Sequence, residues 1–445
     1  MPNGTKHAGT FSPLAESSQS RSVKARATRT CECAEATRRR FVWLCMLSFV
    51  IYILPVVSVA ATPGNWVATW GSSQLRADGA DNLPKQPFSG TTLRQVVRIS
   101  IGGTKLRLRL SNAFGDGPLV LRSVYVSPSG PGKSGVVDPH TQLPVLFNGN
   151  AIAMIPAGAE YVSDAVSMTV PPLSDVTITM LIEAAPRSIT THSGARATSF
   201  LVSGDHVRDE RLSAPETFAH WYFLAGVEVQ GISMAASVVT LGDSITDGHA
   251  ASTDANERWP DVLAARLSKA QIGVVNRGIG GNRVLADGLG PNMLARFDRD
   301  VTATPGARYL IVLEGVNDLG GLDRTSVHDS QAHDALVKAL ETAFVQIVAR
   351  AHSQGLAVFG GTITPYRGSD YYHPSDQSEA DRNALNHWIR TSGVFDSVID
   401  FDKAMRDPSK PSFLDPEVDS GDHLHPNPIG YKRMGELVSL DLFGN

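Results

Sequence analysis

The segment that decides the fold of this chain is Ser237 to Gly248, with the sequence SVVTLGDSITDG. It begins with a short β-branched apolar run, Val238 to Leu241, which is typical of a buried parallel strand. Gly242 ends that strand, and Ser244 follows among Asp and Thr side chains that can cap a helix. A serine at such a turn lies above the carboxyl end of the sheet, where open α/β sheets hold their sites. The segment therefore predicts a capped turn, or a nucleophile beside helix-start N–H groups.

The composition is that of a folded globular protein, because 42% of the 445 residues are apolar and 19% are charged. This length allows two or three domains. The overall net charge of −4 conceals an asymmetry: residues 1–40 carry a net charge of +5 and residues 61–445 a net charge of −9. The acidic body argues against a nucleic-acid partner. All three cysteines precede residue 61, so the body has no cysteine nucleophile, cysteine-ligated zinc or disulfide.

Residues 1–60 have the features of a leader. Residues 1–37 show no hydrophobic period and are expected to be disordered. Three arginines then precede an uncharged apolar run at 41–59, and small residues at 58 and 60 fit a cleavage site. We expect a secreted protein whose signal peptide is cleaved after Ala60. The alternative is a membrane anchor formed by residues 41–59, with the body on the exocytoplasmic side and membrane association retained.

Residues 65–231 have the pattern of a β-rich domain, with short strands separated by Gly, Pro, Ser and Asp clusters. This spacing is typical of an antiparallel β-sandwich or jelly roll. The clearest run, Leu93 to Leu110, alternates apolar and polar residues on both sides of Gly102-Gly103. It predicts a β-hairpin with apolar side chains inside and Arg and Lys side chains outside. We expect Trp66 and Trp70 to be buried anchors, and stacking on a sugar is the alternative.

Residues 237–445 alternate between strand and helix patterns. The expected strands are Val238–Leu241, Ile272–Asn276, Arg308–Glu314, Leu356–Ile363 and Ser397–Asp400. The expected helices are Glu257–Ala270, Ala332–His352, Glu379–Arg390 and Ile429–Leu440. This alternation predicts an α/β domain with a parallel, doubly wound, five-stranded sheet in three layers.

Four polar segments of this second domain become informative when they are taken together. They are Gly242 to Ile245, Asn276 to Asn282, Gly315 to Asp318 and Asp422 to Pro426. The glycines of the second segment allow a tight turn and offer bare N–H groups, although such a turn is often only a turn. The third segment offers an Asn side chain that can donate to an anion, and the fourth places an acid three residues before a histidine.

In their order and spacing, these segments resemble the GDSL or SGNH family of serine esterases. The resemblance covers Ser237 to Asn445 and implies a flavodoxin-like α/β hydrolase domain. The layout, with a β-rich domain first, is similar to that of secreted two-domain members of bacteria and fungi. By matching positions, the resemblance implies that Ser244 is the nucleophile, that His425 is the general base, and that Asp422 orients His425.

The resemblance also implies an oxyanion hole made of the Ser244 N–H, the Gly281 N–H and the Asn317 side-chain amide. Gly280 is the alternative to Gly281, because a slip of one residue in the match is open. The implied reaction is ester hydrolysis through an acyl-enzyme, with no metal or organic cofactor. His423 lies two residues before His425 and could ligate a metal, but the family pattern does not use it.

The substrate is less defined. Tyr366 and Tyr371 belong to a loop after the fourth strand that can bind substrate, and Trp259 can line an acyl pocket or pack its helix on the sheet. We expect a secreted esterase that removes acetyl or other short acyl groups from a polysaccharide. A lipase or phospholipase on longer chains is one alternative. A catalytically inactive glycan-binding or adhesion protein is another.

Overall fold

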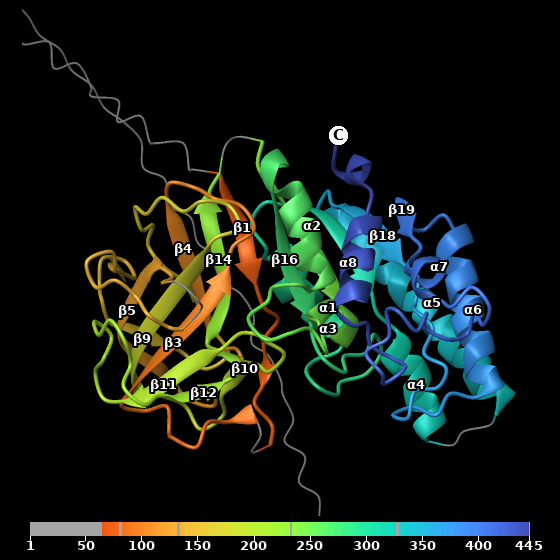
Figure 1. Ribbon diagram of the computed structural model, residues 1–445, viewed down its shortest axis with the longest axis horizontal. Helices are drawn as coiled ribbons and strands as arrows, with labels where there is room; N and C mark the ends of the chain where they lie inside the picture. The colour runs from red at the N-terminus through yellow and green to blue at the C-terminus, as the bar shows by residue number, and fades with distance from the viewer. Residues whose placement is uncertain (1–64, 80–81, 131–133, 232–233, 326–328, 445) are drawn as a thin grey trace, which may run out of the picture. The chain divides into compact units, whose positions relative to one another are not determined.

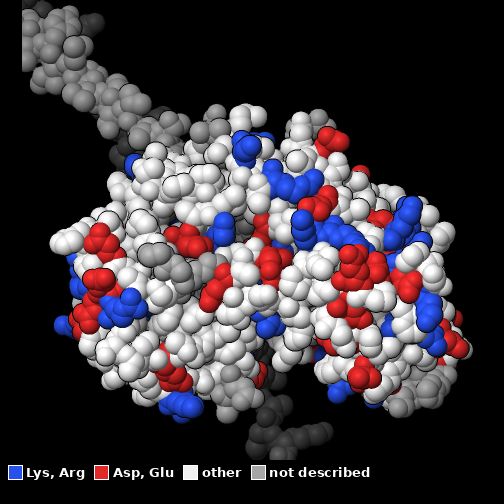
Figure 2. Space-filling model, in the orientation of Figure 1, with Lys and Arg blue, Asp and Glu red and all other residues white. Residues whose placement is uncertain are grey.

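The computed structural model describes residues 65–79, 82–130, 134–231, 234–325 and 329–444 (Figure 1). The leader expected at residues 1–60, with its cleavage site or anchor, lies outside these described residues. Within the described ranges, no helix combines the length and apolar character that crossing a bilayer requires. Figure 2 shows acidic and basic side chains interspersed over the face that it draws.

The first part of the described chain is an assembly of antiparallel sheets, as the sequence predicts. One sheet has the strand order β12-β11-β3-β9-β5-β6, with β7 also paired to β5; a second has the order β1-β14-β4-β8, and a small third has the order β13-β10-β2. The strands are β1 (Trp66–Gly71), β2 (Leu75–Arg76), β3 (Thr91–Arg98), β4 (Leu106–Ser111), β5 (Leu119–Pro128), β6 (Leu143–Val145), β7 (Ala153–Ile155), β8 (Glu160–Val162), β9 (Asp175–Ala184), β10 (Thr190–His192), β11 (Ser199–Ser203), β12 (Glu216–Phe218), β13 (Trp221–Tyr222) and β14 (Leu224–Gln230). Apolar side chains from the two larger sheets share one core.

The hairpin predicted over Leu93 to Leu110 is wrong. β3 pairs with β9 and β11, whereas β4 pairs with β14 and β8, so the chain between them crosses from one sheet to the other. The two glycines lie where the chain crosses between the sheets and passes close to Val170. A Cβ on Gly102 would lie 2.3 Å from the Val170 carbonyl oxygen, and Gly103 forms a β-bridge with Val170. Both strands still alternate, because each turns its apolar face to the shared core. Arg94 is also not outside; it is buried and donates to three backbone carbonyl groups.

The two tryptophans of β1 have different surroundings. Trp70 is buried and packs edge to face on Trp221, with 4.8 Å between the ring centroids. Trp66 is half-buried beneath the Arg107 guanidinium, which lies 4.4 Å from its ring centroid. Trp70 is therefore an anchor of the sandwich core rather than a sugar platform.

The second part has the predicted parallel sheet, with the order β16-β15-β17-β18-β19. Its strands are β15 (Ala236–Gly242), β16 (Ile272–Gly278), β17 (Ala307–Leu313), β18 (Ala357–Gly361) and β19 (Ser397–Ile399). Its α-helices are α1 (Ser244–Asp247), α2 (Trp259–Leu267), α3 (Met293–Phe297), α4 (Val316–Arg324), α5 (Ser330–Ser353), α6 (Asp376–Thr391), α7 (Phe401–Met405) and α8 (Pro428–Leu437). Helix α2 packs against α8, and α5 packs against α6. This is the doubly wound α/β fold that the alternating pattern predicts.

The differences from the predicted helices are local. Helix α2 begins at Trp259 with Pro260 in its first turn, and the last residues of the predicted segment form a 3-10 turn instead. Helix α8 ends at Leu437, because Val438 adopts an extended conformation. Helices α3, α4 and α7 were not predicted. α3 and α7 have five residues each, too few to show a clear apolar period, and α4 begins inside the polar segment Gly315 to Asp318.

Strand β1 of the first part packs beside β16, which is an edge strand of the parallel sheet. The Ala68 N–H donates to the Pro305 carbonyl at 2.9 Å, and the Ser237 hydroxyl donates to the Ala68 carbonyl at 2.8 Å. A Cβ on Gly273 of β16 would lie 2.5 Å from the same Ala68 oxygen. The two backbones therefore approach closely enough that only glycine fits at this position.

Candidate active site

Ser244 is held at the point where β15 passes into α1. A Cβ on Gly242 would lie 2.4 Å from the Leu313 carbonyl oxygen, so the strand can end this close to β17 only with glycine. Asp243 caps α1, because its Oδ1 accepts the Ile245 N–H at 2.9 Å. Ser244 is then the first helical residue, with its N–H at the helix start.

The structure brings Ser244, His425 and Asp422 together. The Ser244 Oγ lies 2.8 Å from His425 Nε2, and His425 Nδ1 lies 2.6 Å from Asp422 Oδ2. Asp422 and His425 come from the loop before α8, whereas Ser244 comes from the other end of the domain sequence. Ser244 is 5% exposed and His425 is 8% exposed, so the hydrogen bond between them is shielded from solvent, whereas Asp422 is exposed.

Asp422 is kept ionised by its surroundings. Partial burial opposes its charge, but hydrogen bonds from the His425 ring and from the N–H groups of His425 and Leu424 outweigh burial and hold the pKa of Asp422 well below its usual range. A carboxylate at this position accepts the proton on His425 Nδ1. The other ring nitrogen, Nε2, is then left to accept the proton of the Ser244 hydroxyl.

Gly280 and Gly281 can now be distinguished. The Gly280 N–H donates to Asp247 Oδ2 at 3.2 Å. Among the described residues, none accepts a hydrogen bond from the Gly281 N–H. Gly281 has a φ of +69°, a left-handed conformation that favours glycine. The N–H that is available to a ligand is therefore that of Gly281.

The amide of Asn317 has a fixed orientation. Asn317 lies in the first turn of α4, and its Nδ2 donates to the Asn282 carbonyl at 2.7 Å. Only the amide nitrogen can donate to a carbonyl, so Oδ1 is the atom that accepts the Tyr372 hydroxyl at 2.5 Å. One Nδ2 hydrogen is used by Asn282, and the second remains for a ligand.

These groups line one cavity of about 650 Å³, together with Ser244 and His425. Apolar groups of Leu289, Leu424 and Tyr372 also line it. Leu289 and Tyr371 are each 58% exposed, so they lie at its rim. Local sequence patterns gave no signal for Leu289, which lies outside the four polar segments, or for Leu424, which is the apolar residue inside the fourth of them.

Of the three predicted substrate-binding residues, only Tyr371 lies at this cavity. Of the two roles expected for Trp259, the acyl pocket is wrong and packing is confirmed: it is fully buried and packs against Phe401, with 5.6 Å between ring centroids. The prediction for Tyr366 is also wrong, because it is fully buried in the core beneath Tyr372. Both side chains belong to the packing of helices and loops on the sheet.

The histidines near the triad do not suit a metal ion. His423 is exposed, and its Nδ1 lies 2.6 Å from Asp419 Oδ2. His249 lies closer, with 4.1 Å between its ring centroid and that of His425. The Arg196 guanidinium donates to His249 Nδ1 at 3.1 Å, so the proton of the neutral ring is on Nε2 and neither nitrogen offers a lone pair. Partial burial and the charges of His425 and Arg196 lower the pKa of His249 to about 4.

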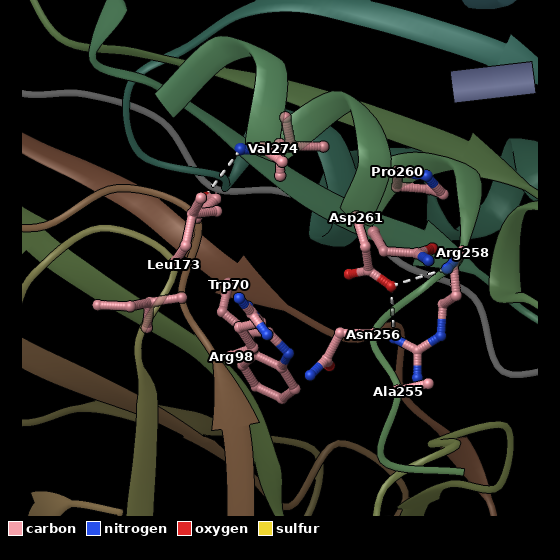
Figure 3. A pocket seen from close by; sticks show the side chains of 14 residues that line it. Trp70, Arg98, Leu173, Ala255, Asn256, Arg258, Pro260, Asp261 and Val274 are labelled. Atoms are coloured by element: carbon pink, nitrogen blue, oxygen red, sulfur yellow. Dashed lines mark hydrogen bonds and ion pairs between the residues drawn. The ribbon is translucent and has the colours of Figure 1, made fainter. Parts of the chain in front are cut away.

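A second cavity, of about 260 Å³, lies between β1 and α2 and does not include the triad (Figure 3). Trp70 and Arg98 line it from the first part of the chain, and Asn256, Arg258 and Asp261 line it from the second. The Arg258 N–H donates to Asp261 Oδ2 at 3.1 Å, and this hydrogen bond caps the start of α2. This cavity is a gap at the junction of the two parts, separate from the site.

Asp243 makes stability depend on pH. Burial, with a contribution from the charge of Asp318, raises the pKa of Asp243 to about 7, although the Ile245 N–H and Arg296 favour the charged form. The folded state then holds a proton that the unfolded state loses near pH 4. This contribution to the free energy of unfolding is complete below about pH 4 and is lost as the pH rises to about 7.

We therefore expect Asp243→Asn to flatten the decline of stability between about pH 4 and pH 7, because asparagine is neutral and can still accept the Ile245 N–H. The measurement is urea unfolding at pH 4, 5, 6 and 7. Asp334→Asn, at an exposed position of α5, is the control and should keep the parental slope. An unchanged slope in Asp243→Asn would contradict the assignment.

Comparison with known proteins gives a family match. Residues 240–433 match the model of the GDSL-like lipase/acylhydrolase family. No curated protein matches the chain. Among solved structures, similarity is found to a lipolytic protein of the G-D-S-L family from Desulfitobacterium hafniense (25% identity, 45% of this chain and 97% of that chain, TM-score 0.33).

Two further similarities are of the same extent. One is to a lipase/acylhydrolase from Enterococcus faecalis (20% identity, 47% of this chain and 96% of that chain, TM-score 0.35). The other is to an acetyl xylan esterase (21% identity, 45% of this chain and 96% of that chain, TM-score 0.35). Because these TM-scores are low, only the family match is used in the functional argument below.

Proposed function

This chain belongs, through residues 240–433, to the GDSL-like lipase/acylhydrolase family, and we propose that it hydrolyses carboxylic esters through an acyl-enzyme on Ser244. The observation that carries the proposal is the continuous hydrogen-bonded chain from Ser244 through His425 to Asp422. A hydroxyl in contact with a neutral imidazole, which is in turn held by a carboxylate, is an activated nucleophile.

In the first half of the reaction, the Ser244 Oγ attacks the ester carbonyl carbon while its proton moves to His425 Nε2. The Asp422 carboxylate stabilises the imidazolium. The oxyanion of the tetrahedral intermediate accepts hydrogen bonds from the Ser244 N–H, the Gly281 N–H and the second Nδ2 hydrogen of Asn317. When the ester C–O bond breaks, the proton on His425 passes to the departing alcohol.

In the second half, water attacks the acyl-enzyme carbonyl and gives its proton to His425 Nε2. The same three donors hold the second tetrahedral intermediate. Collapse of that intermediate returns the proton to the Ser244 Oγ and releases the carboxylic acid.

We propose that the substrates are acetyl or other short acyl esters of a carbohydrate and that the protein is secreted. Tyr371 at the rim supports a sugar as the alcohol portion. The Arg324 guanidinium lies over its ring, 4.5 Å from the centroid, but the residue is still 58% exposed, and an exposed aromatic ring can stack on a sugar. One observation favours a second candidate, a lipase: Leu289 and Leu424 give the cavity apolar walls that would also accept a longer acyl chain.

The chain-length preference decides between the two candidates. We expect kcat/KM to fall steeply from p-nitrophenyl acetate and butyrate to octanoate and palmitate. The protein should then also release acetate from acetylated xylan. A preference for octanoate or palmitate would identify a lipase instead. Failure to cleave any of these esters would leave the alternative of a binding protein without catalysis.

A further inference from the structure

One segment of the β-rich part reaches the loops around the triad. This segment, which runs from the last residue of β10 to the residue before β11, is called the 192–198 segment below. Its contacts are His192 with Asp247, Arg196 with His249, Arg196 and Thr198 with Asp254, and Ala195 with Arg258. Of these partners, Asp247 is the one that also binds the glycine turn beside the triad.

The ring of His192 is fixed on three sides. His192 is 3% exposed, and its Nδ1 lies 2.8 Å from the Ser73 carbonyl oxygen. A carbonyl oxygen can only accept, so Nδ1 carries a proton. The ring stacks on Trp221, with 5.6 Å between centroids and 25° between planes. Its remaining nitrogen, Nε2, lies 2.9 Å from Asp247 Oδ1.

Asp247 also contacts the turn that contains Gly280 and Gly281. It is buried at the end of α1, and its Oδ2 accepts the Gly280 N–H at 3.2 Å. A Cβ on Gly194 of the 192–198 segment would lie 1.8 Å from Asp247 Oδ2, so the segment closes tightly over the carboxylate. Gly281, whose N–H is available to a ligand, follows Gly280 directly.

We propose that His192 is a positioning residue for ester hydrolysis: it holds the Asp247 carboxylate, which fixes the Gly280 peptide and thereby aims the Gly281 N–H at the oxyanion. A turn of consecutive glycines has little intrinsic preference for one conformation, so its donor needs an external anchor. The β-rich part is then a component of the active site. This inference rests on the proposed function.

The test uses two substitutions at one position. In His192→Asn, the side-chain amide can take the place of Nδ1 and keep the hydrogen bond to Ser73, but it is too short to reach Asp247. In His192→Gln, the amide nitrogen can take the place of Nε2 and keep the hydrogen bond to Asp247. Both lose the stacking on Trp221, so a purely structural role predicts similar losses in both.

We expect kcat of His192→Asn on p-nitrophenyl acetate to fall by about 10- to 100-fold with KM nearly unchanged, since a small misplacement of a catalytic group can cost about 100-fold. His192→Gln should recover most of this loss. The control Thr198→Val removes a hydrogen bond of the same segment to Asp254 and should keep the parental kcat. Equal kcat values in the Asn and Gln variants would overturn the proposal.

Asp247→Ala provides a second route if His192→Asn does not fold, because alanine can neither contact the His192 ring nitrogen nor accept the Gly280 N–H. It should lower kcat with KM nearly unchanged, and where both single variants fold, His192→Asn combined with Asp247→Ala should be no worse than the more damaging single change. A parental kcat in Asp247→Ala would also overturn the proposal. Absence of Ser244-dependent activity in the parent protein would instead overturn the proposed function.

Discussion

Replacing Ser244 with alanine is expected to lower kcat/KM on p-nitrophenyl acetate by about 10⁶-fold, because no other group can form the acyl-enzyme. The residual rate would come from the oxyanion donors and from substrate binding. The change removes one oxygen whose side-chain partner is His425 Nε2, and it leaves the Asp243 cap of α1 in place. We therefore expect an unaltered circular dichroism spectrum together with the loss of activity.

The control for this prediction is Ser268→Ala. Ser268 is a buried serine after α2 whose hydroxyl donates to the Ala265 carbonyl, and it does not line the catalytic cavity. It should keep the parental kcat/KM. If Ser244→Ala hydrolysed the ester as fast as the parent, Ser244 would not be the nucleophile.

Replacing Asn317 with alanine is expected to lower kcat by about 10²- to 10³-fold with little change in KM, the typical cost of one oxyanion-hole donor. KM should be insensitive because the donor acts mainly on the negative oxygen of the transition state. Steady-state kinetics on p-nitrophenyl acetate separate the two constants. A rise in KM at constant kcat would show that Asn317 binds the ground state instead.

Tyr372→Phe tests the same Asn317 amide with a smaller change. It removes the hydroxyl that donates to Asn317 Oδ1 at 2.5 Å but leaves the Asn317 amide itself. We expect a smaller loss of kcat than in Asn317→Ala, because the Asn282 carbonyl still holds the Nδ2 side of the amide. A loss as large as that of Asn317→Ala would mean that the tyrosine is needed to hold the amide at all.

The sequence could predict the parallel sheet because buried parallel strands and amphipathic helices leave strong local patterns. The run at Val238 to Leu241 is one example, and it lies inside the observed β15. The Leu93 to Leu110 alternation was equally clear but was assigned to a hairpin. Alternation reports which face of a strand is buried, and it does not identify the partner strand. Two strands from different sheets that face one core therefore give the same pattern as a hairpin.

The polar segments of the site could be predicted from the sequence, because each has an unusual composition at a strand end. The substrate role of Tyr366 is wrong, and the sequence left Trp259 between a pocket and the core, because neither residue belongs to such a segment. An aromatic residue near such a segment has the same local signature in a core as on a rim, and only the packing decides between them. The contribution of His192 was beyond local reasoning, since it lies in the β-rich part and meets Asp247 only in the folded chain.

The packing of β1 beside β16 has a consequence for solubility. An exposed edge strand offers unpaired N–H and C=O groups on which another chain can add a strand, and this is a common route to aggregation. At β16, the Val274 N–H donates to the Ser100 hydroxyl at 3.0 Å, and Gly273 lies against the Ala68 carbonyl. The β-rich part therefore also shields the hydrolase sheet against strand addition at this edge.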